Sequence, residues 1–266
     1  MEHSDNWKMY WKQRAEKSLS DFEYDRGRSP RDREIERLSD EELLSFIRPE
    51  PCDTIFDAGC GSGVNIGRFH SKVRRIVAMD YNKGSVERAR ERIRLARIGN
   101  AEVIQGSIVD IPLPACSVDK VLCMSVLQYL DDGDVQRAFA EFQRILRPGG
   151  MVVLHVKNIS SIYLSTLYLM KKTKSLFRGG VRIEYYRSYR WYMRELESAG
   201  FNIVDYNSFN LLMFEGMPKS LLQFFDKYEL SNYNSWLLRR EFIRRHGSDL
   251  KIRAQLARHA SDHAEV

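Results

Sequence analysis

The chain has 266 residues, with 42 lysines and arginines against 36 aspartates and glutamates, so its formal net charge is only +6. With 43% hydrophobic residues it has enough apolar side chains for a large buried core, which excludes a mainly disordered chain. The positive charge is small and scattered, which makes nucleic acid an unlikely partner.

The sequence carries neither a membrane span nor a secretory leader. No stretch approaches the roughly 18 unbroken apolar residues that a span requires, and the first residues are too highly charged for a signal peptide. The cysteines form no Cys-x-x-Cys pair and have no histidines at zinc-finger spacing. We therefore expect a cytoplasmic protein with reduced thiols and no metal site.

The segment 1–48 predicts a helical lid in front of the core. Residues 5–20 form an amphipathic pattern whose aromatic residues recur at i, i+3 and i+4, namely Trp7, Tyr10 and Trp11. We expect this helix to close over a bound cofactor and exclude water. The alternative is a helix that simply packs on the core.

The segment 49–158 alternates short apolar runs with charged helical stretches, which is typical of a parallel sheet with crossover helices. Strands are predicted near residues 54–58, 75–80, 102–106, 118–124 and 150–156. Helices are predicted near residues 63–71, 83–97 and 133–146. The fold class is therefore α/β, with a doubly wound, mostly parallel sheet.

The segment 159–192 interrupts this alternation with apolar, tyrosine-rich sequence, which indicates an insertion or cap. The segment 193–266 completes the sheet with a helical insertion, and we expect its last strand, around Ile252 to Leu256, at the side of the sheet. Bulky apolar and basic residues are mixed in both segments. A helical cap or homodimer contact explains them better than a peripheral surface that contacts anionic lipid.

The strongest local signal is an apolar strand that runs into the turn Gly59-Cys60-Gly61-Ser62-Gly63. Glycines let backbone amides approach a ligand closely, and the following helix adds a positive partial charge. The dinucleotide spacing fails because Val64 stands where a third glycine is needed, and no Lys-Ser/Thr pair closes a P-loop. A turn that serves only tight packing is the alternative.

Asp80 ends the second predicted strand. A carboxylate at this place can accept both hydroxyl hydrogens of a ribose. An ordinary helix N-cap is the alternative for Asp80, but the nearby glycine turn favours a ligand that contains a nucleoside.

Four segments in order resemble the class I S-adenosylmethionine-dependent methyltransferases, over roughly residues 43 to 206. They are Asp57 to Gly63, Asp80, Val118 to Leu127 and Leu146 to Met151. The resemblance implies a seven-stranded sheet of that family, S-adenosyl-L-methionine as cofactor and methyl transfer as the activity.

The resemblance also implies roles for individual residues. Asp57, Gly59 and Gly61 would hold the methionine part of the cofactor, Asp80 the ribose and Tyr81 the adenine, while Met124 would border the methyl donor with Ser125 and Gln128. The family's Gly-Asp pair at the adenine edge is replaced by Gly106-Ser107-Ile108. Ser107 and Ile108 are therefore candidates for that contact, held without the charge assistance of an aspartate.

A sulfonium leaving group needs little help, so catalysis depends on alignment, exclusion of water and, for a hydroxyl acceptor, removal of one proton. His155 at the end of the fifth predicted strand is a candidate base, as are Tyr10, Tyr129 and Tyr185. A satisfied histidine in a buried strand is the alternative for His155. We expect no catalytic triad.

The predicted substrate is a small molecule, such as a natural product, a sugar-containing metabolite or a lipid-linked intermediate, methylated on a hydroxyl first and on an amine second. Two other functions remain open. An RNA-directed methyltransferase is one, although Cys123-Met124-Ser125-Val126 is not the Asn/Asp-Pro-Pro-Tyr/Phe run of base amino methylation. A non-catalytic cofactor-binding partner subunit is the other.

Overall fold

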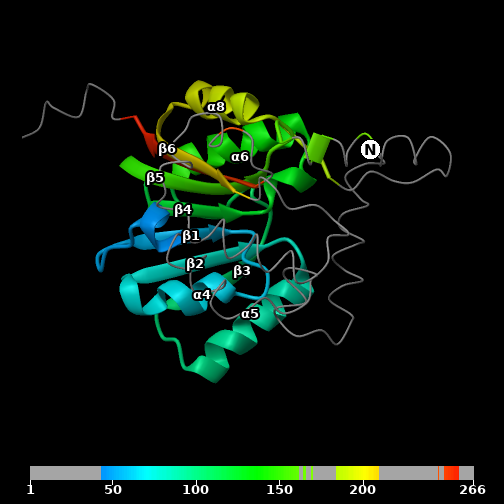
Figure 1. The fold of residues 1–266 in the computed structure, drawn as a ribbon. Helices are drawn as coiled ribbons and strands as arrows, with labels where there is room; N and C mark the ends of the chain where they lie inside the picture. Colours follow the sequence, from blue (N-terminus) through cyan, green and yellow to red (C-terminus); the bar gives the residue numbers. More distant parts are fainter. Residues whose placement is uncertain are drawn as a thin grey trace, which may run out of the picture.

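The computed structural model describes residues 43–161, 164–165, 169, 184–209, 245 and 249–257. The predicted lid helix with Tyr10, and most of the predicted cap, lie outside these residues. The described chain forms one seven-stranded sheet in the order β3-β2-β1-β4-β5-β7-β6 (Figure 1). This confirms the predicted fold class.

The first part of the sheet is parallel. It comprises β1 (Thr54–Ala58), β2 (Arg75–Asp80), β3 (Ala101–Gln105), β4 (Val118–Met124) and β5 (Leu146–Lys157). All residues of the central strand β1 are buried, as expected for a strand covered on both faces. The strand positions agree with the predicted ones, except that β5 begins earlier.

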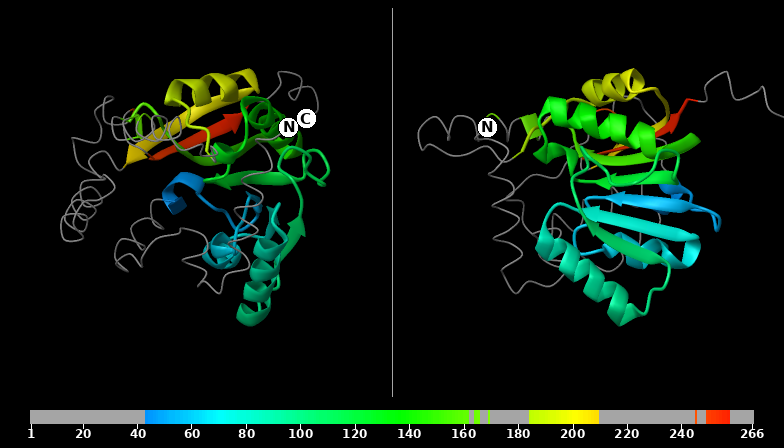
Figure 2. Two further views of the ribbon diagram at one scale, coloured as in Figure 1. Left: turned by 90° about the vertical axis from the view of Figure 1, so that its right-hand side faces the viewer. Right: turned by 180° about the vertical axis from the view of Figure 1, so that it is seen from behind.

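Helices cover the two faces of the sheet (Figure 2). One face packs on α4 (Val64–Phe69) and α5 (Lys83–Ala96), and the other on α6 (Asp132–Ile145) and α8 (Tyr189–Ser198). Short 3-10 turns lie at η1 (His70–Lys72) and η2 (Leu127–Tyr129). None of the helices in the described ranges is long and apolar enough to cross a membrane.

The prediction that the last strand lies at the side of the sheet was wrong. Strand β7 (Asp249–Leu256) is inserted between β5 and β6 (Phe201–Phe209), antiparallel to both, so that β6 is the edge strand. Both faces of β7 are therefore covered, and Lys251 and Arg253 are only 3% and 5% exposed. The basic and apolar residues of β7 alternate because successive side chains point to opposite faces, and both faces are buried. Lys251 and Arg253 lie on one face and the apolar residues on the other.

A buried ion pair secures the amino end of the sheet. Lys120 Nζ on β4 lies 2.6 Å from Asp53 Oδ2, just before β1, and also donates to the carbonyl of Arg48 at 2.5 Å. Both charged side chains are almost completely buried. Each charge therefore depends on the other for compensation of its lost hydration.

Candidate active site

The strand order reverses direction between β1 and β4, which makes the carboxyl ends of these strands a topological switch point. Open α/β sheets bind ligands in the crevice beside such a point. The glycine turn follows β1, Asp80 ends β2, Met124 ends β4, and His155 lies near the end of β5. The topology thus gathers most of the predicted site residues at one end of the sheet.

The glycine turn has a backbone that requires glycine. Gly59, Gly61 and Gly63 have φ values of 78°, 55° and 79°, all left-handed. A Cβ atom on Gly59 would lie 2.3 Å from Val126 Cγ2, so the segment after β4 packs directly on this turn. The amides of Gly59 and Cys60 donate to the carbonyl of Met79 on β2. The turn is therefore held between β2 and the segment that follows β4.

The carboxylate of Asp80 faces this turn. Its Oδ2 accepts a hydrogen bond from the Gly61 amide at 2.9 Å, and its Oδ1 accepts one from the Asn82 amide at 2.8 Å. The N-cap of α5 is Asn82, whose side chain accepts from the Ser85 amide, so the N-cap interpretation of Asp80 is wrong. A carboxylate offers about four acceptor directions, which leaves this geometry compatible with ribose hydroxyls.

The other predicted cofactor residues lie in β1 or directly after β2 and β3, at the same end of the sheet. Asp57 is buried on β1, and its Oδ1 lies 3.4 Å from Asn65 Nδ2. Tyr81 follows Asp80, and 44% of its surface is exposed. Ser107 forms an isolated bridge with Asp110, and the Ile108 side chain is buried. This set of donors, acceptors and an exposed ring fits a nucleoside-containing cofactor.

His155 belongs to a polar chain that spans three strands. Ser125 Oγ, just after β4, lies 2.9 Å from His155 Nδ1, and His155 Nε2 lies 3.2 Å from Asp249 Oδ1 on β7. Lys157 Nζ lies 2.6 Å from the same carboxylate oxygen. These contacts bring together a serine, a histidine and an aspartate, an arrangement that the sequence did not predict. Sequence reasoning missed Asp249 because only the insertion of β7 beside β5 brings it to His155.

Burial favours the neutral form of His155. Burial lowers the pKa of His155 more than the Asp249 carboxylate raises it, and Lys157 and Lys251 lower it further. Burial alone would raise the pKa of Asp249, but Lys157 and His155 hold it well below its ordinary value. At neutral pH the pair is a neutral imidazole beside a charged carboxylate, so the ring can still accept a proton.

A pocket of about 400 Å³ lies beyond the ends of β4 and β5. Its described lining is mainly aromatic and polar: Asp132, Ile159, Tyr185, Tyr186, Arg187, Ser188 and Trp191. The Tyr185 amide donates to the carbonyl of Gln128 in η2, close in sequence to Ser125. This bond joins the pocket wall to the segment that carries the Ser–His–Asp chain.

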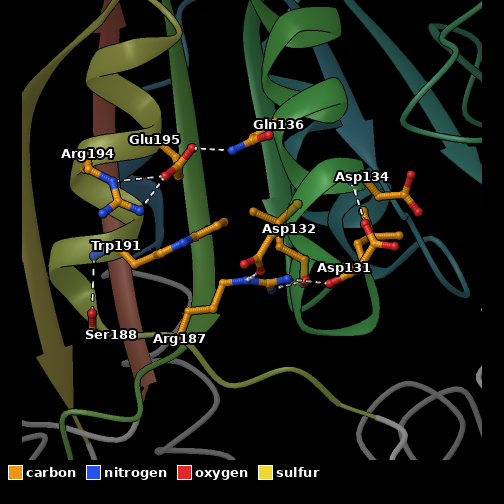
Figure 3. A network of polar contacts seen from close by, with 11 residues as sticks. Asp131, Asp132, Asp134, Gln136, Arg187, Ser188, Trp191, Arg194 and Glu195 are labelled. Carbon is orange, nitrogen blue, oxygen red and sulfur yellow. Dashed lines mark hydrogen bonds and ion pairs between the residues drawn. The ribbon is translucent and has the colours of Figure 1, made fainter. Parts of the chain in front are cut away.

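Arg187 builds that wall (Figure 3). Its guanidinium, 6% exposed as a residue, donates to Asp132 Oδ1 at 2.7 Å and to the carbonyls of Leu127 and Leu130. It also lies 4.7 Å from the centroid of the Trp191 ring. The charge of Arg187 is thus engaged by Asp132, so the pocket offers aromatic surface and hydroxyl groups more than net charge.

The structure places the tyrosine candidates differently. Tyr129 lies in η2 and Tyr185 in the pocket wall, whereas Tyr10 lies outside the described residues. Arg187, Trp191 and Asp132 were not predicted as functional residues. The cluster of tyrosines and tryptophan at residues 185–192, which continues into α8, was the signal that could have indicated the pocket.

Comparisons with known proteins agree with this geometry. Residues 55–150 match the family model described as "Methyltransferase domain". A probable S-adenosylmethionine-dependent methyltransferase of Mycolicibacterium smegmatis is 31% identical over 104 residues, which are 39% of this chain and 38% of that protein. A malonyl-[acyl-carrier protein] O-methyltransferase of Serratia marcescens is 30% identical over 119 residues, or 45% and 44% of the two chains. The chain thus covers less than half the length of each of these relatives.

Among solved structures, phosphoethanolamine N-methyltransferase 1 of Haemonchus contortus superposes with a TM-score of 0.67 at 17% identity. The match covers 98% of this chain and 50% of that one, and it shows the fold alone. The family match, the related sequences and the strand order point to the same conclusion. Residues 55–150 are thus similar to the methyltransferase domain of S-adenosylmethionine-dependent methyltransferases.

Proposed function

We propose that this protein transfers the methyl group of S-adenosylmethionine to a hydroxyl, or as a second choice an amine, of a small molecule. One observation carries the proposal. The contact of Val126 with Gly59 brings the glycine turn and the Ser125–His155 pair together at the carboxyl ends of neighbouring strands. A cofactor cradle and a group that can accept a proton thereby share one crevice.

The cradle residues divide the work of holding the cofactor. The glycine turn and Asp57 would lie against its methionine part, Asp80 would accept from its ribose hydroxyls, and Tyr81 would stack on its adenine. When bound, S-adenosylmethionine supplies a methyl group on a cationic sulfur that leaves without acid assistance. The remaining task of the protein is to align the acceptor and to exclude water.

The pocket beside the crevice supports a small-molecule acceptor. Its volume of about 400 Å³ is within the range of small-molecule sites, roughly 300 to 1,000 Å³. Tyrosine and tryptophan side chains suit rings and sugars, because each offers a flat apolar face and one polar group. His155, neutral and close to Ser125, is the residue that receives the proton of a hydroxyl acceptor.

Calorimetry with S-adenosylmethionine and S-adenosylhomocysteine tests the cradle, and a screen with labelled methyl groups on metabolite, lipid and RNA fractions tests the substrate class. We expect binding of both compounds and label in the metabolite or lipid fraction. Absence of binding overturns the proposal. Label in RNA alone establishes an RNA-directed enzyme instead, and binding without transfer to any fraction establishes a non-catalytic subunit.

A further inference from the structure

The order of hydrogen bonds around His155 follows from the charge of Asp249. Nε2 lies 3.2 Å from the negatively charged Asp249 carboxylate, and this charge favours the tautomer with its proton on Nε2 although the contact is not an aligned hydrogen bond. A neutral imidazole with its proton on Nε2 has its lone pair on Nδ1. The Ser125 hydroxyl, 2.9 Å from Nδ1, must then be the donor in that contact.

The backbone of Ser125 is held in an unusual conformation at this point. Its φ of 59° is in the left-handed region, which is uncommon for a residue other than glycine, and its amide donates to the carbonyl of His155 at 2.8 Å. Strained residues of this kind cluster at functional sites. Ser125 is partly exposed and next to Val126, the residue that packs on the glycine turn.

We infer that Ser125 is a catalytic residue that takes the proton of the acceptor hydroxyl and passes its own proton to His155, with Asp249 as the positioning residue. This inference rests on the proposed function and makes it more specific, because it selects oxygen as the acceptor atom. Ser125 Oγ has lone pairs for an incoming O–H while its own proton is directed at Nδ1.

The step balances in atoms and charge. The acceptor oxygen forms a bond to the methyl carbon, and the carbon–sulfur bond breaks with its electron pair left on sulfur. The acceptor proton moves to Ser125 Oγ, and the serine proton moves to His155 Nδ1. The Asp249 carboxylate offsets part of the cost of burying the resulting imidazolium, which later releases one proton to solvent.

An amine does not need this pathway. A neutral amine attacks with its lone pair, and the extra proton is lost to water after the methyl group has been transferred. An alcohol becomes a good nucleophile only as its proton leaves, which is the situation in which a positioned base accelerates the reaction. The hydrogen bond between Ser125 and His155, at the carboxyl end of β4, therefore favours O-methylation over N-methylation.

Nitrogen NMR of the full chain labelled with ¹⁵N-histidine and saturated with S-adenosylhomocysteine tests the proton order, with His155→Gln to assign the signal. We expect a protonated Nε2 and a bare Nδ1 at pH 7, a mixture of tautomers in Asp249→Asn, and a displaced Nδ1 signal in Ser125→Ala. Ser117→Ala, at the opposite end of β4, is the matched control and leaves the spectrum unchanged. A proton on Nδ1, or no response to Ser125→Ala, overturns the inference.

The acceptor found with labelled methyl groups then tests the catalytic role. We expect a methyl ether as product, a kcat about 100-fold lower in Ser125→Ala with little change in KM, and partial rescue by Ser125→Thr. The groups that face His155 are Ser125, Lys157, Asp249 and Lys251. Asp249→Asn removes the only negative charge among them, so the pKa of His155 should fall and the pH profile of kcat should shift with it. An N-methyl product or wild-type kcat in Ser125→Ala refutes the relay, whereas failure to bind S-adenosylhomocysteine refutes the proposed function itself.

Discussion

Gly59 and Val126 are packed so closely that the segment after β4 leaves no room for a side chain on the turn after β1. This contact ties the cofactor cradle to the residue next to Ser125. Disturbing it should therefore affect both halves of the site.

Gly59→Ala should destabilise the protein by about 1 to 3 kcal/mol and weaken binding of S-adenosylhomocysteine. The added Cβ would meet Val126 Cγ2 at 2.3 Å, and alanine is strained at a φ of 78°. Urea denaturation and calorimetry measure the two effects. Gly67→Ala on α4 is the control, since nothing lies within 4 Å of its Cβ position, and it should stabilise the helix slightly. Equal behaviour of the two variants would contradict the packing argument.

Asp80→Ala should weaken binding of S-adenosylmethionine by more than about 1 kcal/mol, because it removes the proposed ribose acceptor and the bond from the Gly61 amide. Isothermal titration calorimetry gives the difference directly. Glu102→Gln on β3 removes a carboxylate whose partner is the exposed Arg75, and should bind as the wild type does. Unchanged affinity in Asp80→Ala would remove Asp80 from the cofactor site.

The stability of the fold should fall as the pH is lowered through the range in which His155 titrates. The pKa of His155 is lowered on folding, so below about 6.5 the unfolded chain binds a proton that the folded protein does not. That part of the stability is complete above the unfolded pKa and is lost progressively below it. Below about 3.8 the lowered pKa of Asp249 adds a second loss of the same sign.

Urea denaturation between pH 5 and pH 8 checks this dependence. The His155→Gln variant should show a flatter profile than the wild type between pH 5 and pH 6.5, because glutamine does not titrate. Identical slopes for the two proteins would show that His155 is not held neutral by the fold.

Lys120→Met should destabilise the protein by about 3 to 5 kcal/mol, because it leaves the Asp53 carboxylate buried without its cation. The double variant Lys120→Met/Asp53→Leu should recover most of this loss, since neither charge remains buried. Chemical denaturation of both variants measures the coupling. A double variant as unstable as the single one would mean that packing, and not charge, dominates there.

Arg187→Ala should loosen the pocket wall, because it removes the donors to the carbonyls of Leu127 and Leu130 and the ion pair with Asp132. We expect a loss of about 2 kcal/mol or more in stability and faster proteolysis between Tyr185 and α8, with cofactor affinity unchanged. Arg190→Ala, an exposed neighbour on α8, serves as the control in the same proteolysis assay. Equal cleavage of both variants would exclude Arg187 as the anchor.

The local sequence predicted β1 through β4 closely, because each strand is a short apolar run bounded by glycine, proline or charged residues. The sequence also placed the glycine turn and Asp80 at strand ends. Their closeness could be predicted because the carboxyl ends of consecutive parallel strands lie at the same edge of the sheet. The position of β7 could not be read in this way. A strand buried on both faces but carrying Lys251 and Arg253 has the same alternation as an edge strand, and only the pairing with β5 and β6 distinguishes them.

The same limit explains what was missed in the site. His155 could be proposed from its place at the end of a strand, but its partners come from β7 and from the residue after β4. Pairing across strands that are distant in the sequence leaves no local pattern. The sequence alone showed that Ser107 replaces the family's aspartate. The role of Arg187 could be recognised only from the structure, in which it contacts Asp132.

The insertion of β7 also sets an order of events during synthesis. Lys157, at the end of β5, and Asp249, at the start of β7, are 92 positions apart in the chain. At translation rates of about 5 to 20 residues per second, Asp249 is therefore synthesised roughly 5 to 20 seconds after β5. Until then the nascent sheet has an open edge at β5. A ribosome-bound chain would therefore contain the glycine turn, Ser125 and His155 before it contains the carboxylate that lies beside His155.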